Sequence, residues 1–314
     1  MILRVLHGSE SNLQKYAQHP IEADLRRHDY LQGDVARFCE WLSQRLEGHP
    51  IHFSITGYHR QFSTLHDALN AYSWPLKKVS GRPNPDGSYP YIHPTVPTLE
   101  ANSTLAANSA VLDVIQKALR TAYFNVPATS NTLAGAVAAT LHWGGVYKAT
   151  RYGGNKPWLA QNHVNLLSIL QDVVNDHALG GDDSGVTALR FNAGMTKVYS
   201  LLIDDFIIYD SRVAAALAWL ALKWWTVIEG KPQNQLHEHL RFLCLPGNGK
   251  AQKLRNPASS LFTTHATKPY EHYKWNVRAN WLLHRAQALA GTNSRFSSLR
   301  EIEAALFQMG ERVV

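Results

Sequence analysis

Cysteine is scarce in this 314-residue chain. Cys39 and Cys244 are the only two, and neither belongs to a CxxC pair or to a Cys/His pattern with metal-ligand spacing. A disulfide framework, a structural zinc site and an iron–sulfur cluster all need more ligands at closer spacing. We therefore expect no disulfide, no metal and no cofactor. Charged residues make up 18% of the chain and hydrophobic ones 45%, which excludes a disordered protein and predicts a packed core.

Long apolar runs are missing as well. The most apolar segment, Val213–Ile228, contains Lys223 and falls short of the ~20 residues that a membrane-spanning helix needs. The apolar stretch at the start of the chain is too short for a signal peptide, because Arg4 and His7 interrupt it. We expect a monomeric protein of the cytoplasm that has no membrane partner.

Aspartate is absent from the part of the chain that is richest in basic residues. Residues 211–314 contain 14 Lys and Arg, 6 Glu and no Asp, whereas residues 1–210 contain 17 basic and 18 acidic residues. The net charge of +7 therefore comes from the C-terminal third. Such a local excess is typical of a surface that binds a polyanion such as double-stranded DNA. A solvated basic surface without a partner would have the same composition.

The hydrophobic pattern predicts a mainly α-helical chain in two parts. We expect residues 1–98 to form an N-terminal extension with a little β structure at His52–Gly57, where polar and apolar residues alternate. Five prolines in residues 81–98 predict a long loop or a connection between lobes. Residues 99–314 are expected to form an α-helical domain. Apolar residues at three- and four-residue spacing predict helices at 34–46, 109–123, 133–143, 162–178, 211–228, 275–289 and 298–308.

Two residues at predicted helix starts carry the most specific chemical signal. Lys197 follows a small Asn-Ala-Gly corner at Asn192–Gly194 and opens a predicted helix together with Thr196. Asp210 comes thirteen residues later and directly precedes a long apolar helix. The dipole and free amides of a helix start stabilise a carboxylate and disfavour a charged lysine. A neutral lysine is a nucleophile.

Gly194-Met-Thr-Lys197 and Asp210-Ser-Arg-Val213 resemble the helix–hairpin–helix motif and the following Asp of the DNA glycosylase superfamily, in particular its 8-oxoguanine DNA glycosylase branch. The clear resemblance covers residues 186–228 and places the helix–hairpin–helix near 186–210. It implies that Lys197 attacks C1′ of a flipped nucleotide, displaces the base and forms a Schiff base, and that Asp210 stabilises the oxocarbenium charge. An abasic site is left, and strand nicking by AP-lyase chemistry is a possible further step. The hairpin would hold a DNA phosphate through Asn192, Gly194 and Thr196.

Further DNA contacts are expected near this pair. Arg212 is a candidate for a phosphate contact, and Trp143, which precedes Gly144-Gly145, is the favoured ring for stacking on the flipped base. The other aromatic candidates are Trp158, Tyr209, Trp224 and Trp225, although large aromatic residues such as these more often fill a core than line a pocket.

A second hairpin-like segment, Leu245-Pro-Gly-Asn-Gly-Lys250, competes with the first. It is closer to the hairpin of the family than Phe191–Met195, which lacks the proline and one glycine. No Asp follows Lys250, however, so we expect this loop to be a turn or a phosphate contact rather than the source of the nucleophile.

The residues do not name the excised base. The resemblance to the 8-oxoguanine branch implies repair of an oxidised purine. Some similar bacterial proteins instead defend against phages by excising hypermodified bases such as glucosylated hydroxymethylcytosine, and the N-terminal extension and unusual hairpin favour this role slightly. A third hypothesis is a non-catalytic DNA-binding module, in which Asp210 only caps a helix and Lys197 is a solvated surface residue.

Overall fold

The computed structural model describes residues 25–53, 61–75, 91–124, 130–148, 154–178, 180, 189–245, 254–264 and 268–314. Helices dominate these ranges, and no β-strand is formed in them. The prediction of a mainly α-helical chain is confirmed. Among the helices described, none is long and apolar enough to cross a membrane.

Most of the predicted helices are present, in some cases with shifted ends. The helices are α2 (Gly33–Leu46), α3 (Leu65–Asn70), α4 (Leu105–Phe124), α5 (Ser130–Trp143), α6 (Asn155–Asn162), α7 (Leu166–Ala178), α8 (Met195–Leu202), α9 (Ser211–Lys223), α10 (Pro269–Ala290) and α11 (Leu299–Met309). A π-helix, Trp224–Ile228, continues α9. Short 3-10 helices lie at Gln233–Gln235, Glu238–Leu240 and Gly291–Asn293.

Two local predictions differ from the structure. The helix predicted over residues 162–178 begins only at Leu166, because the chain turns between α6 and α7, and Val164 is 70% exposed rather than packed. The strand predicted at His52–Gly57 is not seen, since residues 51–53 have no regular structure and residues 54–57 lie outside the described part. Among the described residues of the N-terminal part, an isolated antiparallel β-bridge joins Trp74 to Ser103.

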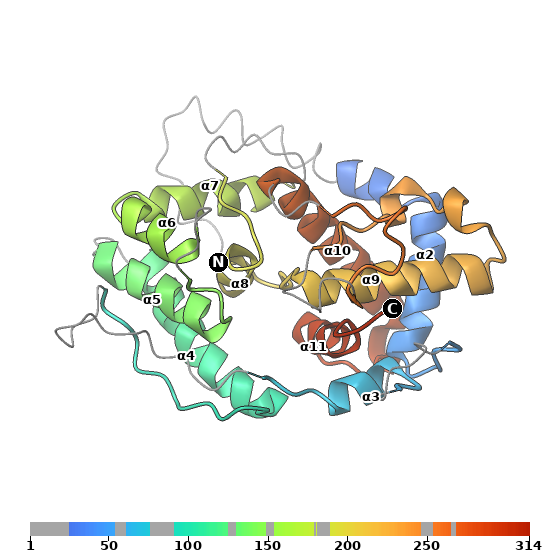
Figure 1. The fold of residues 1–314 in the computed structure, drawn as a ribbon, viewed down its shortest axis with the longest axis horizontal. Coiled ribbons are helices and arrows are strands. Elements are labelled where there is room, and N and C mark those ends of the chain that lie inside the picture. Colours follow the sequence, from blue (N-terminus) through green and yellow to red (C-terminus); the bar gives the residue numbers. More distant parts are fainter. Residues whose placement is uncertain are drawn as a thin grey trace.

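The helices form two groups (Figure 1). Helices α4 to α8 pack on one another and form the first group. In the second group α2 packs against α10, and both α3 and α9 pack against α11. Helices from the two ends of the chain therefore share one core. The chain passes from the first group to the second between α8 and α9.

The centre of the second group is α9, which is apolar on all sides. Every residue from Val213 to Leu222 is buried, as expected for a helix that is covered all round. A Cβ atom at Gly310 would lie 1.8 Å from the carbonyl oxygen of Arg212, so the end of α11 touches the backbone of the first turn of α9. This close approach fixes the start of α9, where Asp210 is located.

Candidate active site

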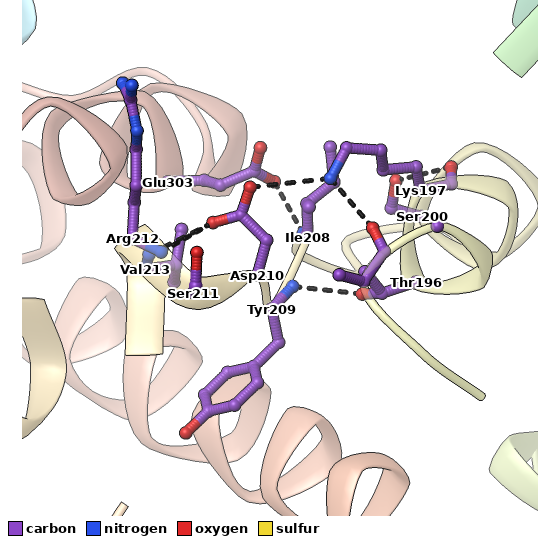
Figure 2. Close-up of polar contacts among 12 residues, drawn as sticks. Thr196, Lys197, Ser200, Ile208, Tyr209, Asp210, Ser211, Arg212, Val213 and Glu303 are labelled. Carbon is purple, nitrogen blue, oxygen red and sulfur yellow. Dashed lines mark hydrogen bonds and ion pairs between the residues drawn. The ribbon is translucent and has the colours of Figure 1, made fainter. Parts of the chain in front are cut away.

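Lys197 and Asp210 face each other where the two helix groups meet (Figure 2). Lys197 is the third residue of α8, and Asp210 is the N-cap residue of α9. The Nζ atom of Lys197 lies 3.4 Å from Oδ2 of Asp210, and the two side chains are 4% and 14% exposed. The structure thus brings together the two residues that the sequence singled out and places both at helix starts. A solvated surface position for Lys197 is excluded.

The two carboxylate oxygens of Asp210 have different partners. Oδ1 accepts hydrogen bonds from the backbone amides of Arg212, at 2.9 Å, and Val213, at 3.3 Å, while Oδ2 faces Lys197. Burial on its own raises the pKa of Asp210, but the charge of Lys197 and the two amides outweigh it and hold this pKa below its usual value. Asp210 is therefore ionised at neutral pH. Capping the helix leaves one oxygen available for chemistry.

The position of Lys197 depends on a glycine that ends α5. A Cβ atom at Gly144 would lie 2.4 Å from Cδ of Lys197, so a larger residue there would force the lysine stem to shift. The ammonium nitrogen also donates to the backbone carbonyl of Ala193 at 2.9 Å. The group that approaches Gly144 is thus the side chain of the candidate nucleophile.

The corner before α8 is built by Asn192. Its Oδ1 accepts hydrogen bonds from the amides of Gly194, at 2.8 Å, and Met195, at 3.0 Å, and its Nδ2 donates to Oδ1 of Asn155 at 2.9 Å. A Cβ atom at Gly194 would lie 2.2 Å from Nδ2 of Asn155, which explains the glycine. In this structure the amides expected to hold a DNA phosphate are engaged by Asn192. Residues 189–191 are not helical, so the helix expected immediately before the hairpin is absent there, and residues 181–188 lie outside the described ranges.

Thr196 and Tyr209 brace the segment between α8 and α9. Thr196 is fully buried, and its hydroxyl donates to Oδ1 of Asn276 at 2.5 Å and accepts from the amide of Tyr209 at 3.0 Å. The ring of Tyr209 points away from the Lys197–Asp210 pair (Figure 2), and its hydroxyl donates to the carbonyl of Leu243 at 2.9 Å. Both side chains are buried and hydrogen-bonded within the protein. Their positions therefore do not support the DNA contacts that were expected of Thr196 and Tyr209.

The remaining predicted residues lie in different surroundings. Arg212 places its guanidinium 4.3 Å from the ring centroid of Phe307 and lies 3.4 Å from the carboxylate of Glu311, so it reaches the edge of the site. Trp224 and Trp225 are buried in the second helix group, away from the Lys197–Asp210 pair. Trp158 lies beneath the guanidinium of Arg190. Lys250 is outside the described residues.

A small cavity surrounds the Lys197–Asp210 pair. Its volume is about 20 Å³, enough for one water molecule and too little for a base. A wider groove of about 600 Å³ adjoins it, and the two share Tyr72, Leu105 and Arg300. Trp143, the candidate stacking residue, lines the cavity. Lining residues that the sequence did not single out include Tyr72, Trp74, Asn108, Arg300, Glu303 and Phe307.

Glu303 is a second carboxyl group beside Asp210 (Figure 2). Its Oε2 accepts hydrogen bonds from the amide of Ile208, at 2.7 Å, and from Arg300, at 2.8 Å. Burial raises the pKa of Glu303 and the charge of Asp210 adds to the rise, whereas Arg300 and the Ile208 amide oppose it. The one sequence signal that could have pointed to Glu303 is a carboxyl group within an otherwise apolar run of α11.

Neither a protein family nor a curated protein or solved structure matches this chain. In the described ranges, no three His, Cys, Asp or Glu side chains gather where they could hold a metal ion. A function is therefore proposed from Lys197, Asp210 and the cavity around them, together with the motifs in which they lie.

Proposed function

We propose that this protein is a DNA glycosylase that uses Lys197 to cleave the N-glycosidic bond of a flipped, modified nucleotide. The observation that carries the proposal is the buried pair itself, with Nζ of Lys197 3.4 Å from Oδ2 of Asp210 in a cavity between two helix groups. A lysine becomes a nucleophile when a neighbouring group takes its proton. The resemblance of both motifs to those of DNA glycosylases supplies the substrate class.

The chemistry assigns one task to each member of the pair. Asp210 accepts a proton from Lys197, whose nitrogen lone pair then forms a bond to C1′ of the nucleotide. The bond between C1′ and the base breaks, and the base leaves with the bonding electrons and takes up a proton. That proton comes from Asp210, whose carboxylate thereby regains its negative charge and stabilises the oxocarbenium character of the sugar. Opening of the sugar gives a Schiff base, which water hydrolyses to an abasic site or which β-elimination converts to a nicked strand.

Features of both the sequence and the site support contacts with DNA in this proposal. The basic excess of residues 211–314 favours the approach of a polyanion. A phosphate at the corner before α8 would replace Oδ1 of Asn192 as the acceptor for the amides of Gly194 and Met195. Arg212, the second residue of α9, is the proposed contact for the neighbouring phosphate of the DNA backbone. These contacts position the strand, while the cavity selects the base.

The resemblance to DNA glycosylases suggests two substrate classes. The first is a hypermodified base of phage DNA, such as glucosylated hydroxymethylcytosine, which would make the protein a defence enzyme. The second is 8-oxoguanine, which would make it a repair enzyme. Either base has to open the cavity, since the space present holds about one water molecule.

Mass spectrometry of the bases released from different DNAs tests the proposal. Duplexes with 8-oxoguanine and phage DNAs with different modifications are incubated with the wild type, with Lys197→Ala and with Lys117→Ala, an exposed lysine on α4 as the matched control. We expect one modified base to be released by the wild type and by Lys117→Ala but not by Lys197→Ala. If no DNA loses a base although DNA is bound, the protein is a binding module and the proposal is wrong.

A further inference from the structure

The ring of Trp74 fills the side of the cavity next to Trp143. The two indole rings are parallel, with an interplanar angle of 3° and centroids 4.5 Å apart. On the side of the second helix group, Trp74 also contacts the ring of Phe307, at a centroid distance of 5.3 Å. The guanidinium of Arg212 lies over Phe307 in turn. A chain of planar groups therefore connects the two helix groups at the cavity, and Trp74 is the member that joins them.

The indole ring of Trp74 stacks on Trp143, but its N–H group makes no hydrogen bond. Its indole N–H is buried without a hydrogen-bond partner, whereas the N–H of Trp143 donates to Oδ1 of Asn108 at 3.0 Å. A buried donor without an acceptor costs free energy. The position thus suits the face of an aromatic ring, and the edge of this indole finds no partner there.

The backbone of Trp74 is held while its ring has no polar anchor. The amide of Trp74 donates to the carbonyl of Ser103, and its carbonyl accepts from the amide of Asn102. A rotation about the side-chain bonds can therefore move the ring without breaking this bridge. Departure of the ring would join its volume to the present cavity, beside Lys197 and Asp210.

We propose that the place filled by the Trp74 indole is a binding site for a bicyclic base, a purine, and that Trp74 swings out when the base enters. Indole and purine are both fused rings of six and five atoms, so a purine can take over the stack on Trp143 and the contact with Phe307. A base also carries acceptors on its edge, which an indole lacks. The inference rests on the proposed function and narrows its substrate to purines, which favours an oxidised purine over a sugar-bearing pyrimidine.

Binding of free ligands to Trp74→Ala tests the site without any requirement for catalysis. Indole and adenine are titrated into the wild type, Trp74→Ala and Trp158→Ala, a control in which a tryptophan outside the cavity is removed. We expect Trp74→Ala to bind both probes tighter than the other two proteins, on the order of tenfold or more, as engineered apolar cavities bind ligands that fit them. A folded Trp74→Ala protein that binds neither probe would overturn the proposal.

The wild-type protein provides a second measurement in case Trp74→Ala does not fold. In protein labelled with 5-fluorotryptophan, the fluorine resonance of Trp74 is identified by its absence in Trp74→Phe. We expect it to shift when a duplex with an uncleavable 8-oxoguanine nucleotide is added, and to stay in place with an unmodified duplex. If the modified duplex binds and the resonance does not move, Trp74 does not leave. If no base is ever excised but adenine still binds to Trp74→Ala, the proposed function fails and the purine site stands.

Discussion

The two walls of the cavity carry opposite chemistry. The wall formed by the first helix group offers one amine, Lys197, whose stem crosses Gly144 in apolar surroundings. The wall formed by the second group offers two carboxyl groups, Asp210 and Glu303, which backbone amides and Arg300 hold in place. This difference means that a proton leaving Lys197 has its acceptor on the opposite wall. In the proposed reaction, the relative position of the two helix groups therefore sets the distance over which the proton moves.

The largest effect is expected from removing the acceptor while keeping the helix cap. Asn is a good N-cap residue, so Asp210→Asn should retain the hydrogen bonds to Arg212 and Val213 and lose the negative charge. We expect the rate of base release to fall by about 10²–10⁴-fold, the usual contribution of a general base. Single-turnover kinetics on the substrate DNA measure the change. Asp210→Ala serves as the comparison, with about 1 kcal/mol less stability than Asp210→Asn. Full activity of Asp210→Asn would show that Asp210 acts only as a cap.

A smaller effect should follow from crowding the stem of Lys197. The Cβ atom introduced by Gly144→Ala would overlap Cδ of Lys197 and push the amine away from its position. A displacement of about 1 Å typically costs on the order of 10²-fold in rate. We expect kcat to fall while the affinity for DNA stays within error. Asn131→Ala, at the exposed first turn of α5, is the control, and equal rates for the two variants would contradict this role of Gly144.

The two carboxyl groups should change the free energy of unfolding in opposite directions as the pH rises. The pKa of Asp210 is below its ordinary value, so its stabilisation is present above about pH 4 and is lost as the pH falls through the lowered pKa. The pKa of Glu303 is above its ordinary value, so stability is lost as the pH rises from about 4.5 through the raised pKa.

Chemical unfolding between pH 3 and 7 measures both effects. The difference in unfolding free energy between the wild type and Asp210→Asn should grow as the pH rises. The corresponding difference for Glu303→Gln should shrink. If both differences in unfolding free energy changed in the same direction with pH, the pKa values of Asp210 and Glu303 would not be shifted in opposite directions, and the prediction would be wrong.

The smallest effect is expected at the corner before α8. Asn192→Ala removes the acceptor for the amides of Gly194 and Met195, which should cost about 1 kcal/mol of stability. Asn192→Asp keeps an acceptor and should recover most of this loss. Thermal unfolding of the three proteins provides the comparison. A loss for Asn192→Asp as large as that for Asn192→Ala would show that the contact with Asn155, and not the two amides, carries the stabilisation.

Residues close together in the chain were predictable in this protein. Lys197 and Asp210 lie thirteen positions apart, and both were expected at helix starts from the apolar helices that follow them. Tyr209 shows the limit of such reasoning. It is next to Asp210, but neighbouring side chains in an extended segment point in opposite directions. Its ring therefore lies in the core while the carboxylate faces the cavity.

The rest of the cavity could not be predicted because it is assembled by packing. Trp74 follows α3, Phe307 belongs to α11, and both reach the site because α11 packs against α3 and α9. No periodic pattern or motif marks either residue. Two adjacent glycines mark the loop at Gly144 in the sequence, but only the structure shows that the group beside Gly144 is Lys197.

Reductive trapping tests the central role of Lys197 most directly. Duplex DNA with an abasic site is incubated with the protein and sodium borohydride, and the modified peptide is identified by mass spectrometry. We predict one covalent adduct, attached to Nζ of Lys197 and absent from Lys197→Ala. An adduct on another lysine such as Lys250, or base release without any adduct, would contradict the assignment of Lys197 as the nucleophile.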